Sequence, residues 1–271
     1  MSQTLTDSVE LSNGVQMPVL GLGTWQVAEG DQARRTVAEA LELGYRHIDT
    51  AMIYENERSV GQAVRDSGLP REQVFVTTKC WNTDMRSGKV VEAFEKSLRL
   101  LDIDYVDLYL LHWAVGDYAG CWDKMRKVLA SGKARAIGVS NFLIHHLEKL
   151  SSPPTVNQIE YHPWLQSTEL RGYCQSNRIV VEAWSPIMQG KVTGVPALVE
   201  IGRGHGKSPA QVALRWALQR DVVVIPKSTK KKRLVENADV FDFTLTDGEM
   251  AAIDALDRNH RLGADPDNVP F

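Results

Sequence analysis

The sequence predicts an α/β fold, a (β/α)8 TIM barrel, from three observations. Short apolar runs rich in β-branched residues occur eight times and alternate with amphipathic helical stretches, the pattern of repeated βα units. The chain has 271 residues and is 43% hydrophobic, which suits one such barrel, so residues 1–271 are expected to form a single domain. Eight strands with eight crossovers also favour a closed barrel over an open doubly wound sheet, whose edge strands would be more polar.

The expected elements follow one another along the chain. Strands are expected at residues 19–23, 45–49, 74–79, 106–112, 134–140, 155–160, 179–183 and 222–226. Helices are expected at residues 31–43, 57–67, 87–101, 121–131, 144–150, 168–176, 209–219 and 230–238. Before the first strand, an Asn13-Gly14 turn predicts an N-terminal β-hairpin at residues 9–17 that covers the barrel floor. After the eighth unit, a Thr246/Glu249 capping box predicts an extra C-terminal helix at residues 246–257, followed by a tail rich in Gly, Asp, Pro and Asn.

Composition and charge argue against several classes of partner. The formal net charge of −3 gives no basic footprint for nucleic acid or an anionic membrane, because the one basic run at residues 230–233 is local. No basic leader and no apolar run of ~18 residues occurs, so neither export nor membrane insertion is expected. The three cysteines are too scattered for a disulfide framework or a zinc site, which favours a reducing compartment. We expect a cytoplasmic monomer that binds no metal.

Ionisable side chains stand at the ends of three consecutive expected strands. Asp49, Lys79 and His112 end the second, third and fourth strands, and Tyr54 follows Asp49 by five residues. The C-terminal ends of barrel strands meet at one mouth and carry the chemistry. A single residue of each type at such a position is more often a cap, a solvated side chain or a packing residue. The prediction of a site therefore depends on finding all four together.

This set of residues suits proton transfer to an oxygen. The tyrosine hydroxyl has an ordinary pKa of about 10, which a neighbouring ammonium such as that of Lys79 would lower. Asp49 would hold the ammonium in place and keep it charged. His112 could either share the proton with Tyr54 or orient a substrate carbonyl. We expect Tyr54 to protonate an oxygen whose carbon receives a hydride.

The sequence lacks the motifs of several other enzyme classes. Neither a Gly-x-Ser-x-Gly elbow nor a Ser-His-Asp order indicates a hydrolase. The first strand carries no His-x-His pair for a metal-dependent barrel hydrolase. The glycines at residues 21–26 lack the third member of a Gly-x-Gly-x-x-Gly fingerprint, so a Rossmann site is not expected.

The order of motifs over essentially the whole chain resembles the aldo-keto reductase superfamily. The matching segments lie at residues 49–57, 78–79, 107–113, 137–142, 157–163, 183–186 and 225–229. The short loop after strand four and the compact tail resemble the small microbial and protozoan reductases of the 2,5-diketo-D-gluconate reductase and prostaglandin F synthase type. The resemblance implies an NAD(P)H-dependent oxidoreductase that converts an aldehyde or ketone to an alcohol. It also implies a catalytic tetrad in which Tyr54 is the general acid, Lys79 and Asp49 tune it, and His112 orients the carbonyl.

The resemblance further implies a nicotinamide site. Ser140, Asn141 and Gln158 would hydrogen-bond the carboxamide, and Trp184 would stack on one face of the ring. A barrel binds phosphate through the loops after its seventh and eighth strands. Those loops offer Ser185, Gln189, Gly190, Lys227, Ser228, Thr229 and Arg233. Because cations with hydroxyl donors suit a 2′-phosphate, NADPH is favoured over NADH, and Glu236 and Asn237 would contact the adenine.

The substrate end is expected to be apolar and aromatic. Trp25, Trp81 and Trp113 would converge over the position of hydride transfer, with Asn82 as a polar contact. Such a pocket holds carbon skeletons through contact area, so a broad range of carbonyl substrates is expected. The loop at residues 116–120 and the tail at residues 262–271, including Val269 and Phe271 as a lid, would shape specificity. A non-catalytic barrel that only binds the cofactor is the alternative, and the intact tetrad argues against it.

Overall fold

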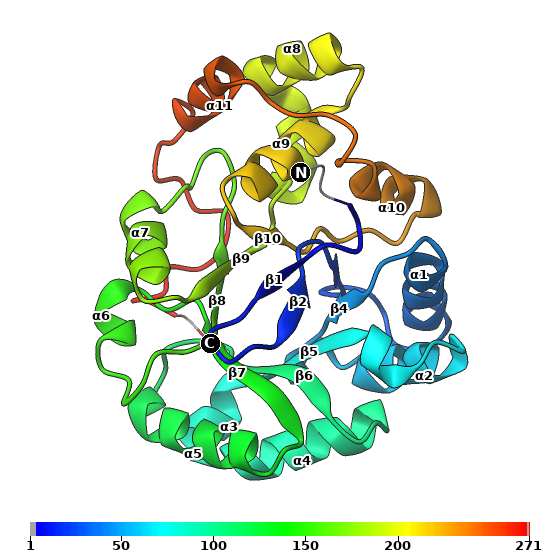
Figure 1. Ribbon diagram of the computed structural model, residues 1–271. Coiled ribbons are helices and arrows are strands. Elements are labelled where there is room, and N and C mark those ends of the chain that lie inside the picture. The colour runs from blue at the N-terminus through cyan, green and yellow to red at the C-terminus, as the bar shows by residue number, and fades with distance from the viewer. Residues whose placement is uncertain (1–3, 270) are drawn as a thin grey trace.

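Eight parallel strands form the barrel in the structure, a computed structural model that describes residues 4–269 and 271 (Figure 1). They pair in chain order from β3 to β10. Their bounds are β3 Leu22–Gly23, β4 His47–Asp49, β5 Phe75–Cys80, β6 Val106–Leu111, β7 Ala134–Ser140, β8 Val156–Glu160, β9 Val180–Trp184 and β10 Val223–Val224. A parallel bridge between Leu20 and Val224 joins the last strand to the first, and the Gly21 amide donates to the Val224 carbonyl at 2.9 Å. The sheet therefore closes, and the expected (β/α)8 TIM barrel is confirmed.

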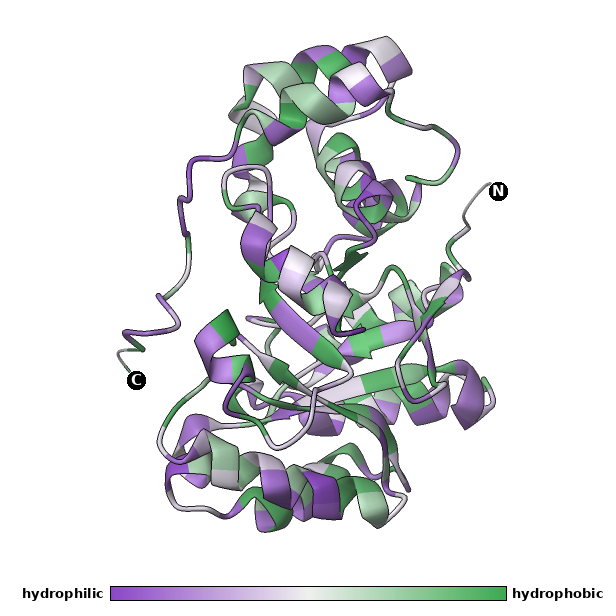
Figure 2. Cartoon of the chain, turned by 60° about the vertical axis from the view of Figure 1, so that its left-hand side comes forward, coloured by the Kyte–Doolittle hydropathy of each residue, from purple (hydrophilic) through white to green (hydrophobic). Residues whose placement is uncertain are grey.

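Helices surround the ring of strands (Figure 1). Their bounds are α1 Asp31–Glu42, α2 Glu57–Asp66, α3 Asn82–Arg86, α4 Val90–Leu101, α5 Tyr118–Ala130, α6 Ile144–Leu147, α7 Thr168–Ser176, α8 Pro196–His205, α9 Pro209–Gln219, α10 Lys231–Ala238 and α11 Asp247–Asp254. Short 3-10 turns lie at Met52–Tyr54, Arg71–Gln73 and Met188–Gly194. Green and purple residues alternate along the strands and helices in Figure 2, as expected for elements with one apolar side. Among the described residues, no helix has the length and hydrophobicity needed to cross a membrane.

Both expected additions to the barrel are present. The antiparallel strands β1 Ser8–Glu10 and β2 Gln16–Pro18 form the N-terminal hairpin. Buried Leu11 and Met17 of this hairpin region pack with strand residues such as Leu108 and Leu110, so the hairpin closes the floor of the barrel. The extra helix α11 begins with the expected capping box, in which Thr246 and Glu249 each bond the backbone of the other.

Several sequence-based boundaries were wrong. The segment expected as strand 19–23 forms strand pairing only at Leu22–Gly23 and an isolated bridge at Leu20. Helix α4 begins at Val90 rather than at residue 87, because α3 and a turn at Gly88 occupy the preceding residues. Residues 118–120, expected in a loop, form the first turn of α5, where the Asp117 side chain accepts a bond from the Gly120 amide. Neither α3 nor α8 was predicted from the sequence.

Alternation along the strands decides which side chains face the barrel lumen. On β6, Leu108 and Leu110 pack toward the hairpin inside the barrel, whereas Tyr109 and Leu111 pack toward the helices. By the same alternation, Lys79 on β5 faces inward, as does Phe75 four residues before it. The lumen is thus apolar at its floor and polar near the C-terminal ends of the strands.

Candidate active site

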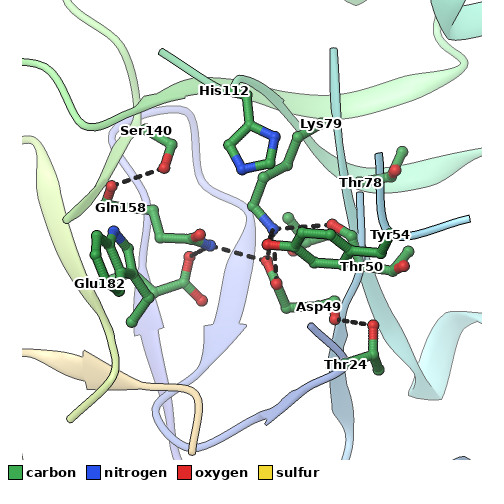
Figure 3. Close-up of polar contacts among 12 residues, drawn as sticks. Thr24, Asp49, Thr50, Tyr54, Thr78, Lys79, His112, Ser140, Gln158 and Glu182 are labelled. Atoms are coloured by element: carbon green, nitrogen blue, oxygen red, sulfur yellow. Dashed lines mark hydrogen bonds and ion pairs between the residues drawn. The ribbon is translucent and has the colours of Figure 1, made fainter. Parts of the chain in front are cut away.

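Asp49, Lys79 and Tyr54 meet at the C-terminal end of the lumen (Figure 3). The Lys79 ammonium donates to both carboxylate oxygens of Asp49, at 2.6 and 2.7 Å, and to the carbonyl of Thr50 at 2.9 Å. It lies 3.5 Å from the Tyr54 hydroxyl. Lys79 is fully buried and Asp49 is 2% exposed. The structure therefore brings together three of the four residues expected for proton transfer.

Asn56 holds the turn that presents Tyr54. Its side-chain amide donates to the carbonyls of Thr24 and Val27, both at 3.0 Å, and its oxygen accepts from the Thr50 hydroxyl at 2.6 Å. The 3-10 turn that contains Tyr54 follows β4 directly. Because these bonds tie the turn to the loop after β3, the phenol is held over Lys79 rather than free in solvent.

Burial dominates the protonation states of the site. Burial lowers the pKa of Lys79, but Asp49 and Tyr54 more than offset this, so the pKa of Lys79 is raised and the ammonium keeps its charge. Burial raises the pKa of Tyr54, and Lys79 offsets only part of that rise. Lys79 does lower the pKa of the phenol, as expected. The expected net decrease is wrong, because the effect of burial is larger than that of Lys79.

His112 stands beside the phenol as a neutral imidazole. Its ring lies edge-on to those of Tyr54 and Trp81, with centroids 5.9 and 5.0 Å away. Burial, reinforced by Lys79, lowers the pKa of His112 well below its ordinary value. Nδ1 is buried without a hydrogen-bond partner among the described residues, which favours the tautomer with its proton on Nε2. Of the two roles left open by the sequence, this state suits a donor that orients a carbonyl.

The residues expected around a nicotinamide lie together at the ends of β7, β8 and β9. Ser140 donates to the Gln158 carbonyl at 2.9 Å, and the indole of Trp184 donates to the Asn141 side-chain oxygen at 2.8 Å. Asn141 and Ser185 both have positive φ values, 61° and 52°. Non-glycine residues in this left-handed region are strained, and such strain concentrates at functional sites.

A cavity of about 800 Å³ joins these groups. It runs from Asp49, Tyr54 and His112 past Trp184 to the loops after β9 and β10. The members of the expected cofactor set that line it are Ser140, Asn141, Gln158, Trp184, Ser185, Gln189, Gly190, Lys227, Ser228, Arg233, Glu236 and Asn237. Thr229 does not line the cavity, and Lys79 lies behind its wall. Lys227, an exposed residue whose pKa partial burial lowers, is one of two cations at its far end.

The substrate end of the cavity is aromatic, as expected. Trp25, Trp81 and Trp113 line it, and Trp25 is 48% exposed at the rim. Phe271 stacks on Trp81 at 5.6 Å and meets Trp113 edge-on at the same centroid distance. Asn82 departs from its expected role, because it is buried, does not line the cavity and donates to the Phe271 carbonyl at 3.3 Å.

The C-terminal tail crosses the cavity and is fastened at intervals. It descends along one side of the molecule as a mostly hydrophilic coil (Figure 2). The Glu160 carboxylate accepts from the backbone amides of Leu262 and Gly263, at 2.6 and 3.1 Å. There the chain lies so close to the Trp184 ring that a Cβ on Gly263 would come within 2.3 Å of it. The tail thus covers the side of the cavity next to Trp184.

Asp267 makes a second attachment, to two histidines of α6. Its Oδ1 lies 2.9 Å from Nε2 of His145 and 3.2 Å from Nε2 of His146. Among the described residues, this is the one group of three or more such side chains whose ligand atoms are close enough to share a metal ion. However, Nδ1 of His146 accepts the Leu143 amide at 3.1 Å, so the neutral ring carries its proton on Nε2. That nitrogen donates to Asp267 instead of offering a lone pair to a metal.

Sequence reasoning missed part of this site. The cavity is also lined by Gly23, Gln26, Ile53, Pro186, Ile187, Val192, Thr193, Ala210 and Ile225, and the expected tail contributes Leu262, Gly263 and Ala264. Most belong to loops that carry no motif of their own. Glu182, which is buried and accepts a hydrogen bond from the Gln158 amide, was missed as well. Alternation could have found it, because Glu182 precedes Trp184 by two residues on β9 and must face the same lumen.

Comparison with known proteins agrees with this geometry. The family model for the aldo/keto reductase family matches residues 19–258. A glyoxal reductase of Bacillus subtilis is 49% identical, and the match covers 100% of both chains. A 9,11-endoperoxide prostaglandin H2 reductase of Trypanosoma cruzi is also 49% identical, over 96% of this chain and 95% of that protein. The crystal structure of an aldo-keto reductase from a deep-sea metagenome library of the Medee basin superposes with a TM-score of 0.94 at 44% identity, covering 97% of this chain and 100% of the other.

The fold and site define an NAD(P)H-type oxidoreductase that acts on carbonyl groups. The chain belongs to the aldo/keto reductase family.

Proposed function

We propose that this protein reduces aldehydes and ketones to alcohols with NADPH, using Tyr54 as the general acid. The observation that carries the proposal is the buried Lys79 ammonium, which bonds Asp49 at 2.6 and 2.7 Å and lies 3.5 Å from the Tyr54 hydroxyl at the inner end of the cavity. A phenol that gives up its proton next to this charge leaves a stabilised phenolate. Proton donation by a positioned side chain is general acid catalysis.

The residues along the cavity fit a nicotinamide cofactor. A cofactor of this kind supplies the hydride when bound. Gln158 keeps its amide nitrogen toward Asp49, at 2.8 Å, and so leaves its oxygen for a carboxamide donor. Trp184 closes one side, and Lys227 with Arg233 offers two cations at the far end. Two cations and the Ser228 hydroxyl suit a 2′-phosphate, which supports NADPH over NADH.

Each member of the tetrad then has a separate task. Tyr54 gives its proton to the oxygen that becomes the alcohol, and Lys79 stabilises the phenolate that remains. Asp49 holds Lys79 charged although both side chains are buried. His112 donates from Nε2 to the same oxygen and thereby orients the carbonyl carbon.

The aromatic rim supports a broad range of small carbonyl substrates. Trp25, Trp81, Trp113 and Phe271 offer apolar contact area, and His112 is the polar group among them. The 49% identity with a glyoxal reductase supports including small dicarbonyls in this range. Apolar contacts of this kind discriminate weakly between carbon skeletons.

The test is consumption of NADPH by the whole protein with a panel of carbonyls that includes glyoxal, methylglyoxal and a simple aromatic aldehyde. We expect turnover well above the rate without protein and a lower rate with NADH. Cofactor binding without turnover of any of these substrates would instead indicate the non-catalytic alternative. Gel filtration of the same preparation tests whether the chain acts, as we propose, as a monomer.

A further inference from the structure

A second carboxyl group, that of Glu182, lies in the lumen next to the Asp49–Lys79 pair (Figure 3). Glu182 belongs to β9 and is fully buried. It lies in register with Gln158 on β8. The proposed catalytic roles do not use it. A buried carboxyl so near to a catalytic ion pair must influence that pair, because charges interact strongly where water is excluded.

Gln158 connects the two carboxyl groups. Its side-chain nitrogen donates to Asp49 Oδ2 and to Glu182 Oε2, both at 2.8 Å. An amide flip would place the Gln158 oxygen against two carboxyl oxygens, so the orientation of this side chain is fixed. Glu182 therefore helps to aim a group that borders the cavity.

Glu182 has no cation of its own. Lys79 donates its hydrogen bonds to the Asp49 carboxylate and the Thr50 carbonyl, and it lies near Tyr54. Within the described part of the chain, Glu182 Oε1 accepts no hydrogen bond. An ionised carboxylate with an unpaired buried oxygen is costly, whereas a protonated carboxyl can donate from that oxygen.

His47 lies beside that oxygen. Its Nε2 lies 3.5 Å from Glu182 Oε1 and 3.2 Å from the Thr77 hydroxyl. The imidazole fits here because residue 21 is a glycine, where a Cβ would come within 2.7 Å of the ring. Burial, with a smaller contribution from Lys79, lowers the pKa of His47 to about 3, so the ring is neutral and brings no positive charge to Glu182.

We propose that Glu182 is a positioning residue of the reductase, one that remains protonated at neutral pH and so leaves the charge of Lys79 to Asp49 and Tyr54. This inference rests on the proposed function. With Glu182 neutral, the lumen holds one positive and one negative charge. With Glu182 ionised, it would hold a second negative charge, which opposes formation of the Tyr54 phenolate.

The electrostatics of the lumen agree with this assignment. Burial, followed by the Asp49 carboxylate, raises the pKa of Glu182 to about 8. Burial raises the pKa of Asp49 as well, whereas Lys79 and Gln158 lower it. Lys79 bonds Asp49 directly, at 2.6 and 2.7 Å, and is therefore the cation of Asp49 rather than of Glu182. The charged or titratable groups that act on Glu182 are His47 and Asp49 from β4 and Lys79 from β5, and Glu182 in turn raises the pKa of Tyr54.

A pH dependence of the chemical step follows. As pH rises through about 8, Glu182 ionises, the pKa of Tyr54 rises further, and the phenol becomes a weaker acid. A like charge nearby shifts a pKa by about one to two units, and with a Brønsted sensitivity of about one half the rate changes by about three- to tenfold. The single-turnover rate of aldehyde reduction should therefore fall by this factor between about pH 7 and about pH 9.5.

Glu182→Gln tests this pH dependence, with Glu57→Gln as the matched control. Glutamine keeps an acceptor for Gln158 and removes the ionisation. Glu57 is also a buried glutamate, but it bonds the Thr78 hydroxyl at 2.6 Å on the helix side of β5 and does not touch Gln158. We expect the rate to fall above pH 8 in the wild type and in Glu57→Gln. In Glu182→Gln this fall should be absent. An unchanged fall in Glu182→Gln would overturn the inference.

A second measurement reads the proton on Glu182 without cofactor, substrate or activity. In the wild type labelled with ¹³C at the glutamate side-chain carboxyl, one carbon resonance should titrate near pH 8 and be absent from the spectrum of Glu182→Gln. Titration of every glutamate carboxyl below about pH 6 would overturn the inference even if the variant fails to fold. A wild type that shows the titration but reduces no carbonyl would overturn the proposed function and leave the protonation of Glu182 established.

Discussion

Lys79 is the residue on which the chemistry and the local stability both depend. It is fully buried, and its ammonium is bonded by Asp49 and the Thr50 carbonyl. Burying two charges is expensive, and their mutual attraction offsets that cost only when the geometry is good and other polar atoms are satisfied. At this site both conditions hold, since Gln158 also donates to Asp49.

Lys79→Met should reduce both turnover and stability. The phenol would lose its stabilising charge, and Asp49 would stay buried without its cation, which typically costs about 3–5 kcal/mol. Lys133→Met is the matched control, because Lys133 pairs with Glu95 on the surface, where the two side chains are 47% and 38% exposed and such pairs contribute about 0–1 kcal/mol. Chemical denaturation and steady-state kinetics of both variants make the comparison. Equal stability losses in the two would refute this description of the Asp49–Lys79 pair.

At single positions, sequence reasoning succeeded where a residue type and strand periodicity agreed. Asp49, Lys79 and His112 could be placed because they lie at or next to the C-terminal ends of three consecutive strands and occur there together with Tyr54. Asn82 could not, because a residue at the start of α3 turns with that helix, and α3 was not predicted. Glu182 was overlooked because strand alternation places it in the lumen without showing its bond from Gln158, which only the pairing of β8 with β9 reveals.

At the level of elements, the segment after β10 supplies Lys227 and Arg233, the cations that line the far end of the cavity. Arg233 lies in the first turns of α10 and lines the cavity, whereas its neighbour Lys232 does not. A helix N-terminus adds favourable partial charge for an anion. The preference for NADPH should therefore depend on particular cations rather than on the basic run as a whole.

Arg233→Ala should weaken the binding of NADPH and leave the binding of NADH nearly unchanged. Losing one charge-assisted contact of roughly 1.5–3 kcal/mol raises the dissociation constant by about tenfold or more. Lys232→Ala serves as the control and should change neither constant. Quenching of Trp184 fluorescence on titration with each cofactor measures both. If Arg233→Ala weakens NADH as much as NADPH, Arg233 supports the adenine end of the site or the helix itself.

Helices α3 and α8 were not predicted because their sequences show no clear helical periodicity. Helix α8 contains Gly202 and Gly204, which weaken a helical pattern, yet Pro196 begins it and Leu198 packs into the core. Helix α3 has only five residues, too few for a period of 3.6 to be visible. The eight strands were predictable because each is short, buried and followed by a helix, and pairing within the barrel then corrected their ends.

At the scale of the whole molecule, the lumen couples stability to pH. The pKa of Glu182 is about 8 in the folded protein and near 4.5 ordinarily. Between these values the folded state binds more protons than the unfolded state, so this group's contribution to stability is lost as pH rises toward 8. His47 acts in the opposite direction at lower pH, since its pKa falls from 6.5 to about 3 on folding, and stability rises with pH in that window.

Glu182→Gln should therefore gain stability relative to the wild type as pH rises from about 5 to about 8, on the order of a few kcal/mol. Thermal unfolding of the two proteins at several pH values measures this difference. Glu57→Gln controls for the loss of any buried carboxyl. A difference that stays constant across the range would mean that Glu182 does not change its protonation on folding. The same scans test the prediction that residues 1–271 are one domain, which requires a single cooperative transition.

The central claim is that a hydride from NADPH reaches the carbonyl carbon while Tyr54 protonates the oxygen. A single turnover with NADPH deuterated at the reactive carbon, followed by mass spectrometry of the alcohol, tests it in the wild type and in Tyr54→Phe. We predict deuterium on the former carbonyl carbon in both proteins and a rate lower by about 10²- to 10⁴-fold in the variant, with cofactor binding retained. An alcohol without deuterium, or a Tyr54→Phe rate equal to that of the wild type, would contradict the account.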